Sequence, residues 1–205
     1  MYIKDLNEYN AIPAGYKQIF QNKFSNSISN NEVIKRKAEG VFNDRDLEVV
    51  KFLFKFKFAT LQQIYDYLTV TDNLGVNNEN IEVSIYSIKS RLEKLVQNRV
   101  LNKFMLAEDV DISLKEDALY FYCLDLGGKF LLTNYSNEDT SDWYVRGNLK
   151  ASELISKDIF TTQFYISLLN SCGHKVVYFY TYPIRTCDKL TYIPTFEFAI
   201  NHNGV

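Results

Sequence analysis

The chain of 205 residues contains few of the residues that build disulfide frameworks or zinc sites. Its three cysteines, Cys123, Cys172 and Cys187, are widely spaced, and the two histidines complete no zinc-binding spacing with them. This pattern indicates reduced thiols in a cytoplasmic protein. Cys123 lies among aromatic residues, which favours a buried, inert thiol over a nucleophile.

Long apolar runs are also missing. The first ten residues, MYIKDLNEYN, contain no apolar run, so we expect no signal peptide. The longest apolar stretches elsewhere are far shorter than a membrane span. We therefore expect a protein of the cytoplasm that has no membrane partner.

Motifs that carry catalysis are missing as well. The chain has no Gly-rich phosphate loop, no G-x-S-x-G motif and no cluster of metal ligands. Glu153 and Asp158 share a predicted helix, but nothing near them in the sequence would raise the pKa of either carboxyl group. His174 follows a helix-ending glycine, which is typical of a surface histidine. We expect no enzyme, no metal and no cofactor.

Positive charge is not in excess either, since the formal net charge is −2. A slightly acidic chain has no overall attraction to nucleic acid, so any DNA binding must come from a local patch. By contrast, 46% of the residues are hydrophobic, including 15 Tyr and 15 Phe, which predicts folded structure over most of the length.

Periodicity and composition predict the α+β class with four segments. Residues 1–42 form an N-terminal arm that docks weakly or is ordered only by a partner. Residues 43–133 form a winged helix-turn-helix domain, and residues 134–148 form a linker. Residues 149–205 form a small α/β unit of one helix (149–171) and strands (175–182 and 192–200). The last unit is too small to close a core alone, so we expect it to pack on the winged helix or on a second copy.

The order of elements within residues 43–133 suggests the winged helix. Asn43 or Asp44 caps a helix over 44–54, and Thr60 with Gln63 forms a capping box for a second helix. A loop over 69–82 precedes the third helix. A strand (100–106), an acidic turn (107–118), a return strand (119–124) and a short helix (129–132) follow.

The third helix is predicted to have one apolar face and one polar face. Ile85, Ile88, Leu92 and Leu95 form one apolar stripe at helical spacing, and Asn98 can end the helix in a left-handed conformation. The opposite face carries short polar groups, one aromatic ring and cations. These candidate DNA-binding residues are Ser84, Tyr86, Ser87, Lys89, Ser90, Arg91 and Lys94.

Short polar side chains near the start of such a helix can reach base edges, and cations can contact phosphates, so we expect double-stranded DNA as the partner. The basic run Lys35, Arg36 and Lys37 could reach phosphates or a minor groove, or could simply be solvated. The alternative for the third helix is that its polar side is the solvated face of an ordinary amphipathic helix.

The turn between the two strands carries the opposite charge. Lys115 is its only cation, and the acidic residues around it are Glu108, Asp109, Asp111, Glu116 and Asp117. Such a wing would be repelled by phosphates. Either it points away from the duplex, or it binds a basic protein surface, or the whole module is a protein-interaction or inhibitor module.

The order of these signatures resembles the replication-relaxation proteins of Gram-positive plasmids and other mobile elements. FKFATLQQIYDYL resembles that family's first landmark, and SRLEKLVQNRVLNKF its recognition segment, with Asn98-Arg99 where a glycine is more usual. YFYCLDLGGKFLL is similar to its return strand and closing helix. KDIFTTQFYISLL resembles the helix that opens its second domain, with Lys157 in place of a histidine.

The resemblance covers about residues 43–169 and implies a winged-helix DNA-binding protein that acts in plasmid replication, conjugative transfer or transcriptional regulation. The family's second half resembles a restriction-endonuclease sheet with a Pro-Asp pair at a strand start. Here Pro194 is followed by Thr195, so no metal-binding carboxylate can be matched. We therefore expect a non-catalytic remnant used for packing or for forming a homodimer.

Overall fold

The structure, a computed structural model, describes residues 1–6, 12–24, 28–74, 84–187 and 190–201. The helices are α1 (Asn30–Ala38), α2 (Asp44–Phe56), α3 (Leu61–Asn73), α4 (Ile85–Gln97), α5 (Leu126–Tyr135) and α6 (Ser152–Cys172), with short 3₁₀ helices η1 (Val145–Asn148) and η2 (Gly173–Lys175). The strands are β1 (Lys17–Phe20), β2 (Phe58–Thr60), β3 (Leu101–Ala107), β4 (Phe121–Leu124), β5 (Val176–Thr181), β6 (Arg185–Cys187), β7 (Leu190–Tyr192) and β8 (Phe196–Ile200). The predicted α+β class is confirmed.

Helices α2 and α3 begin where the sequence predicts. The Asn43 side chain accepts a hydrogen bond from the backbone N–H of Asp46, and the Asp46 carboxylate accepts one from the N–H of Asn43. Thr60 and Gln63 form the same reciprocal pair at the start of α3. Each box satisfies N–H groups that the first helical turn leaves without partners.

The ends of these two helices differ from the prediction. Helix α2 continues to Phe56 rather than stopping at 54, because the Phe56 ring is buried in the core, and it ends at Lys57 with φ +71°. Helix α3 continues to Asn73, so the first residues of the predicted loop 69–82 are helical. The rest of that loop, from residue 75, lies outside the described residues.

The predicted stripe of α4 faces the interior. Ile88, Leu92 and Leu95 are buried, Ile85 is half-buried, and Val96 is a buried residue that the stripe did not include. The hydrophobic effect therefore fixes which side of α4 faces the solvent.

The expected end of α4 is wrong by one residue. Asn98 has φ −85°, and the left-handed residue is Arg99, with φ +60°. Asn98 instead donates its side-chain amide to the carbonyl of Lys94. Arg99 is held in place by its guanidinium, which lies 2.8 Å from the buried carboxylate of Asp125.

The main sheet has the strand order β1-β3-β4-β2, and each neighbouring pair is antiparallel. The predicted strands 100–106 and 119–124 correspond to β3 and β4. Strand β2, which precedes α3, pairs with β4 from Phe58↔Cys123 to Thr60↔Phe121. Strand β2 thus forms one edge of the sheet.

The N-terminal segment is built into the fold, so the expectation of a loosely docked arm is wrong. Strand β1 forms the other edge of the sheet by pairing with β3, with Lys17 opposite Ala107. Ile3, Ile12 and Tyr16 are buried, and the N–H of Ile3 donates to the carbonyl of Leu106. Farther along, α1 packs on α5.

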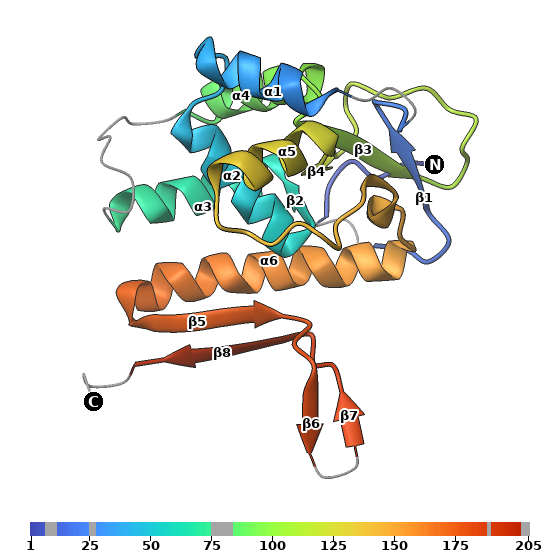
Figure 1. Ribbon diagram of the computed structural model, residues 1–205. Helices are drawn as coiled ribbons and strands as arrows, with labels where there is room; N and C mark the ends of the chain where they lie inside the picture. Colours follow the sequence, from blue (N-terminus) through green and yellow to red (C-terminus); the bar gives the residue numbers. More distant parts are fainter. Residues whose placement is uncertain (7–11, 25–27, 75–83, 188–189, 202–205) are drawn as a thin grey trace.

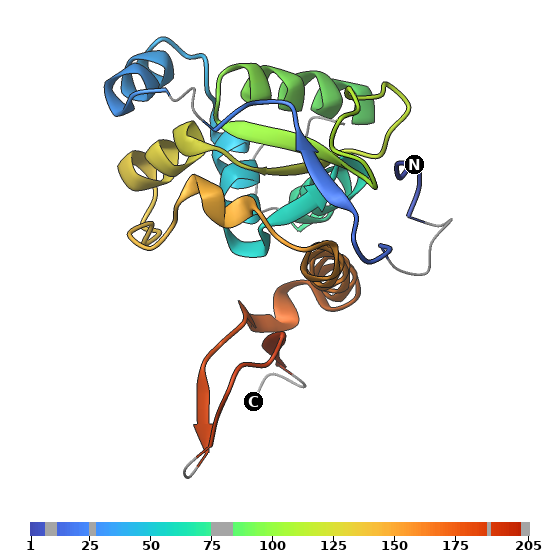
Figure 2. The same ribbon diagram turned by 90° about the vertical axis from the view of Figure 1, so that its right-hand side faces the viewer.

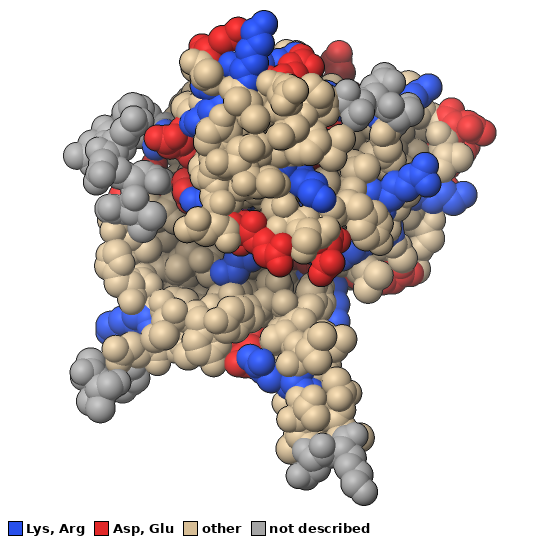
Figure 3. Space-filling view, viewed as in Figure 1, with Lys and Arg blue, Asp and Glu red and all other residues tan. Residues whose placement is uncertain are grey.

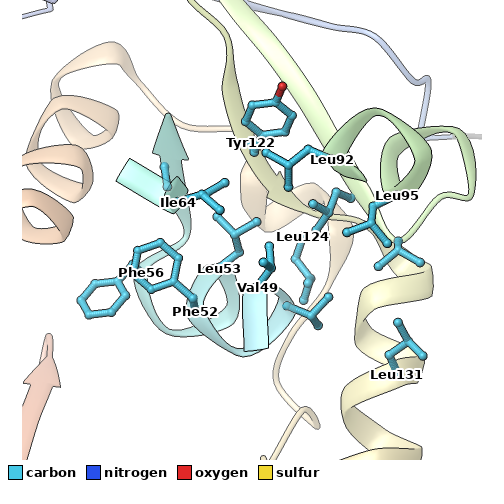
Figure 4. Close-up of a cluster of buried hydrophobic side chains, with 14 of the residues drawn as sticks. Val49, Phe52, Leu53, Phe56, Ile64, Leu92, Leu95, Tyr122, Leu124 and Leu131 are labelled. Atoms are coloured by element: carbon cyan, nitrogen blue, oxygen red, sulfur yellow. The ribbon is translucent and has the colours of Figure 1, made fainter. Parts of the chain in front are cut away.

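Two groups of buried side chains hold the elements together. The larger fills the space between α2, α3, α4 and α5, and Figure 4 shows its centre around Leu53, Leu92 and Leu124. The smaller joins Ile3 to Phe104, Phe121 and Ile155, and so links the N-terminus, the sheet and α6.

Close backbone packing positions α5. A Cβ atom on Gly128 would lie 2.5 Å from the carbonyl oxygen of Val100, and one on Gly127 would lie 2.6 Å from that of Arg99. The two glycines let the first turn of α5 lie directly against the chain that leads into β3. Asp125 caps this turn by accepting from the N–H of Leu126.

The predicted linker packs against the rest of the fold. Trp143 is 9% exposed and Asn148 3% exposed. The Asn148 amide donates to the carbonyl of Leu124, and Gln18 of β1 bonds both the carbonyl of Asn148 and the N–H of Lys150. This segment fastens the start of α6 to both β1 and β4.

Helix α6 separates two parts of the molecule, with α1–α5 and the main sheet on one side and a β-ribbon on the other (Figures 1 and 2). The predicted helix over 149–171 is present but begins three residues later, at Ser152, and its predicted C-cap glycine, Gly173 at φ +53°, is confirmed. Strands β5 and β8 pair in antiparallel fashion beneath α6. The β6–β7 hairpin, which the sequence analysis did not predict, projects from their end.

Candidate nucleic-acid interface

Helix α4 lies on the outside of the sheet, above β3 in Figure 2, and presents one face to solvent. Tyr86 has 81% of its surface exposed. The other exposed residues of this face are Ser84, Ser87, Lys89, Ser90 and Lys94. Six of the seven candidate residues on α4 are thus accessible together. We call these six residues the α4 polar face.

The start of α4 is shaped by its own serines. The Ser84 side chain accepts from the N–H of Ser87, and the Ser87 hydroxyl donates to the carbonyl of Ser84 at 2.7 Å. No acidic residue lies in the first turn of α4, so this turn does not itself offset the positive end of the helix dipole. This end of the helix suits an anionic group.

Arg91 has a structural role rather than the expected phosphate contact. Its guanidinium bonds both carboxylate oxygens of Asp46, one of them at 2.7 Å through Nε, and also donates to the carbonyl of Val41. The Asp46 side chain is 2% exposed, and its hydrogen bond raises the pKa of Arg91. Arg91 therefore joins α4 to the capping box of α2, which removes it from the candidate interface.

The remaining cations of α4 are free of such contacts. Among the residues that the structure describes, neither Lys89 nor Lys94 forms an ion pair. Both are exposed, so their side chains can rearrange around a ligand. They are the best-placed phosphate contacts of the α4 polar face.

The basic run on α1 is close to α4 but largely neutralised. Arg36 pairs with Glu32 and also donates to the Asn98 side chain at 2.5 Å, which places α1 beside the end of α4. Lys37 lies 3.0 Å from Asp44, and Lys35 lies 3.8 Å from the carboxylate of Glu39, which follows the last residue of α1. Lys35 is the most exposed of the three, with 75% of its side chain accessible.

An open groove of about 780 Å³ runs between α4, the start of α3 and the loop that joins β3 to β4. Lys89 lines it from α4, and Lys4 lines it from the N-terminus. Lys103 also lines it, but its ammonium lies 2.6 Å from Glu93 and 4.5 Å from the centre of the Tyr120 ring. The groove is therefore continuous with the α4 polar face.

Part of the acidic charge of the β3–β4 loop is paired within the chain. Glu108 binds the N-terminal ammonium at 3.0 Å, and Asp117 binds Lys4 at 2.6 Å. The Asp117 pKa is lowered because its carboxylate accepts hydrogen bonds from Lys4 and Tyr2. Figure 3 accordingly shows acidic and basic side chains intermixed on this view of the surface.

The other three loop carboxylates, Asp109, Asp111 and Glu116, are exposed. They lie on the loop that borders the groove, and Glu116 is one of the groove's lining residues. Negative charge at this border disfavours close approach of a phosphate.

Residues considered for catalysis have structural roles. Burial raises the pKa of the Cys123 thiol, and the side chain lies in the smaller core. Asp158 is buried and bonds Lys150 at 2.9 Å and the Tyr182 hydroxyl at 2.5 Å, so it joins α6 to the ribbon. Within the described ranges, no group of three or more His, Cys, Asp and Glu residues could hold a metal ion.

The buried carboxylates Asp46, Asp125 and Asp158 stabilise the fold through ion pairs that the sequence analysis did not predict. Asp46 had a detectable signal, because it is the third residue after the cap Asn43. No local sequence pattern predicts its bond to Arg91, which lies 45 positions away.

Comparison with protein-family models, with curated proteins and with solved structures gave no match to this chain. None of the described helices combines the length and the apolar content needed to cross a membrane.

Proposed function

We propose that this chain is a sequence-specific double-stranded DNA-binding protein that inserts the α4 polar face into a major groove. The observation that carries the proposal is that face itself: exposed Ser, Tyr and Lys side chains without a carboxylate, on a helix anchored from behind by buried aliphatic residues. Short hydroxyl side chains suit base edges, and lysines suit phosphates.

The arrangement of elements supports this proposal. The elements follow one another in the order α2, β2, α3, α4, β3, a loop and β4. Strand β4 pairs with both β3 and β2. A winged helix has this order, with its third helix as the recognition helix and the β3–β4 loop as its wing. In this reading the acidic wing makes no contact with the phosphates of the duplex, because Asp109, Asp111 and Glu116 would be repelled by them.

Charge supports a binding unit with more than one copy. With a net charge of −2 and two unpaired lysines on α4, a single chain makes few phosphate contacts. A homodimer doubles those contacts and reads two half-sites. The resemblance of the sequence to replication-relaxation proteins gives the expected process, which is replication, transfer or transcriptional control of a mobile element.

A mobility-shift assay with the DNA upstream of the protein's own gene, repeated at several salt concentrations, tests the proposal. Replacing Lys89 and Lys94 by alanine should weaken binding and reduce the slope of log affinity against log salt by about 2, or about 1 per lost phosphate contact. Lys175→Ala, also exposed but distant in sequence, is the matched control. Wild-type affinity and slope in the double variant would contradict the proposal.

The exposed carboxylates of the β3–β4 loop favour one second candidate, a module that binds a basic protein. A pull-down that returns a single basic protein without nucleic acid, and that fails after Asp109→Asn, Asp111→Asn and Glu116→Gln, would support it. The same triple variant should leave DNA binding intact or improve it if the first proposal is correct.

A further inference from the structure

A pocket of about 440 Å³ lies where the β-ribbon, formed by strands β5 to β8, meets the rest of the molecule. Helix α2 forms one wall, Tyr67 of α3 and Tyr165 of α6 line the pocket from two other helices, and residues 179–181 of β5 line it from the ribbon. The Thr181 hydroxyl donates to the carbonyl of Lys55, which holds β5 against α2. A cavity of this size, at a junction between two parts of a fold, is large enough for a small molecule.

The walls of this pocket are mainly aromatic. Helix α2 supplies Phe52 and Phe56, and Phe52 stacks on Tyr67 with ring centres 4.1 Å apart. The Tyr165 ring centre lies 4.7 Å from that of Phe56 and 4.9 Å from that of Phe179. These contacts fix the rings relative to one another, so the pocket offers a preformed apolar surface on which an aromatic ligand can pack.

One ammonium group lies among these rings. The Nζ atom of Lys55 is 4.8 Å from the centre of the Tyr165 ring, 5.4 Å from that of Phe56 and 5.7 Å from that of Phe179. With the residues that the structure describes, it forms neither a hydrogen bond nor an ion pair. Burial lowers the pKa of Lys55, and Glu138 offsets this only in part, because Glu138 is exposed and water screens its charge. The hydration that the ammonium has lost is therefore not replaced by a bound anion of the chain.

Two hydroxyl groups in the same pocket also lack partners. Tyr67 and Tyr165 are both half-buried, and neither hydroxyl is hydrogen-bonded within the described part of the chain. Burial raises the pKa of both tyrosines, and the nearby Tyr165 raises that of Tyr67 further, so both remain donors at neutral pH. Lys55, Tyr67 and Tyr165 thus bring three donor groups without protein partners to one aromatic pocket, a combination typical of a binding site.

We propose that this pocket binds a small carboxylic acid with an aromatic body, whose carboxylate accepts hydrogen bonds from the Lys55 ammonium and a tyrosine hydroxyl while its ring packs on the aromatic walls. Lys55 balances the single negative charge of a carboxylate. A phosphate dianion is disfavoured because Glu48 and Glu138 also line the pocket. The other lysine there, Lys51, is already paired with Glu48 at 2.8 Å.

Such a ligand would contact α2, α6 and β5 together and would fasten the ribbon to the rest of the molecule. Because it binds the folded chain, it should also raise the thermal stability of the protein. The inference goes beyond DNA binding and does not rest on it, since none of the described lining residues belongs to α4. A chain that binds DNA but no carboxylic acid would overturn only the inference, and the reverse result would overturn only the proposed function.

Titration of the full chain with benzoate, followed by the NMR shifts of backbone amides, is the direct test. Binding should saturate with a Kd of about 1 mM or tighter, and the amides of Lys55 and Phe179 should be among those that shift. Benzamide, which has nearly the same shape without the charge, should bind at least ~10-fold more weakly, because it cannot form the charge-assisted hydrogen bond. Inorganic phosphate should not compete with benzoate.

Variants identify the groups that hold the carboxylate. Lys55→Met removes the charge but leaves the backbone carbonyl that binds Thr181, and it should weaken benzoate binding at least ~10-fold. Tyr165→Phe removes one donor and should weaken binding about 2- to 10-fold. Lys175→Met, an exposed change outside the pocket, should bind as wild type does. Circular dichroism checks that each variant is folded, and Tyr165→Phe decides the question if Lys55→Met is not.

Several results would overturn the inference. One is the absence of saturable benzoate binding, and another is equal affinity for benzoate and benzamide. Wild-type affinity in a folded Lys55→Met variant, or in Tyr165→Phe if the lysine variant does not fold, would do the same. Tighter binding of tetramethylammonium than of benzoate would also overturn it, because the rings would then act as a cage for cations.

Discussion

The two β-structures of this protein are stabilised differently. In the main sheet, the central strand β4 is buried along its whole length, and the outer strands β1 and β2 are held by segments far away in the sequence. In the ribbon, β5 has one buried residue, Phe179, and β8 has none. The first structure is buried between several elements of the chain, whereas the second is supported by α6 and by single contacts with α2, such as the hydrogen bond from the Thr181 hydroxyl to the Lys55 carbonyl.

Ion pairs show the same contrast. In the part of the molecule that contains the main sheet, the buried Asp46 pairs with Arg91 and the buried Asp125 pairs with Arg99. The pair in the ribbon, Arg185 with Glu197, is half-buried, with 41% and 31% of the two side chains accessible. Removing one member of a buried pair leaves an uncompensated charge, whereas an exposed charge returns to water. Removing one member of a buried pair should therefore lower the free energy of unfolding more than removing one member of the ribbon pair.

Arg91→Ala should have the largest effect on stability. It leaves the Asp46 carboxylate buried without its cation, which is expected to lower the free energy of unfolding by about 3–5 kcal/mol. Urea denaturation measures this change. Lys94→Ala, an exposed change one turn along the same helix, should stay within about 0.5 kcal/mol. Equal effects of the two variants would show that Arg91 is not structural.

Gly128→Ala should have the next largest effect. The new Cβ would meet the backbone of Val100 at 2.5 Å, so α5 must shift against β3. Overpacking of this kind costs about 1–3 kcal/mol in unfolding free energy. Gly147→Ala is the control, because its nearest neighbour is the Tyr144 ring at 3.7 Å. Thermal unfolding of the two variants, side by side, measures the cost of placing a Cβ atom at this close approach.

Glu197→Gln should have the smallest effect, confined to the ribbon. Amides of β5 and β8 should exchange faster, while the urea midpoint should move far less than in Arg91→Ala. The Glu197 pKa is lowered by its hydrogen bond from Arg185, so the pair contributes above the ordinary value of 4.5 and is lost as the pH falls through the lowered pKa. Wild type should therefore lose the same protection in acid, and the variant should not lose more.

Local signals in the sequence predicted a large part of the fold. The caps at Asn43, Thr60 and Gly173 depend on residues within three or four positions, and the stripe of α4 depends on period alone. The end of α2 was missed because Phe56 packs equally well in a helix or a strand. Local pattern cannot decide between them when tertiary packing does.

Long-range contacts account for the other differences between the predicted and the observed structure. Ile3 and Ile12 are isolated apolar residues in a polar stretch, and only their distant partners make them part of a core. Arg91 looks like its neighbours Lys89 and Lys94 in sequence, and only its contact with Asp46 separates it from the candidate interface. The α4 polar face was predicted because helical geometry alone determines it.

The pairing of β1 with β3 sets an order of events during synthesis. Tyr2 and Ile3, on the N-terminal side of β1, have their partners at Leu106, Ala107 and Leu119, more than a hundred positions later. They must stay unpaired until those positions have been translated, because the strand that receives them does not yet exist. The beginning of the chain therefore completes its share of the sheet only after most of the helices have been made.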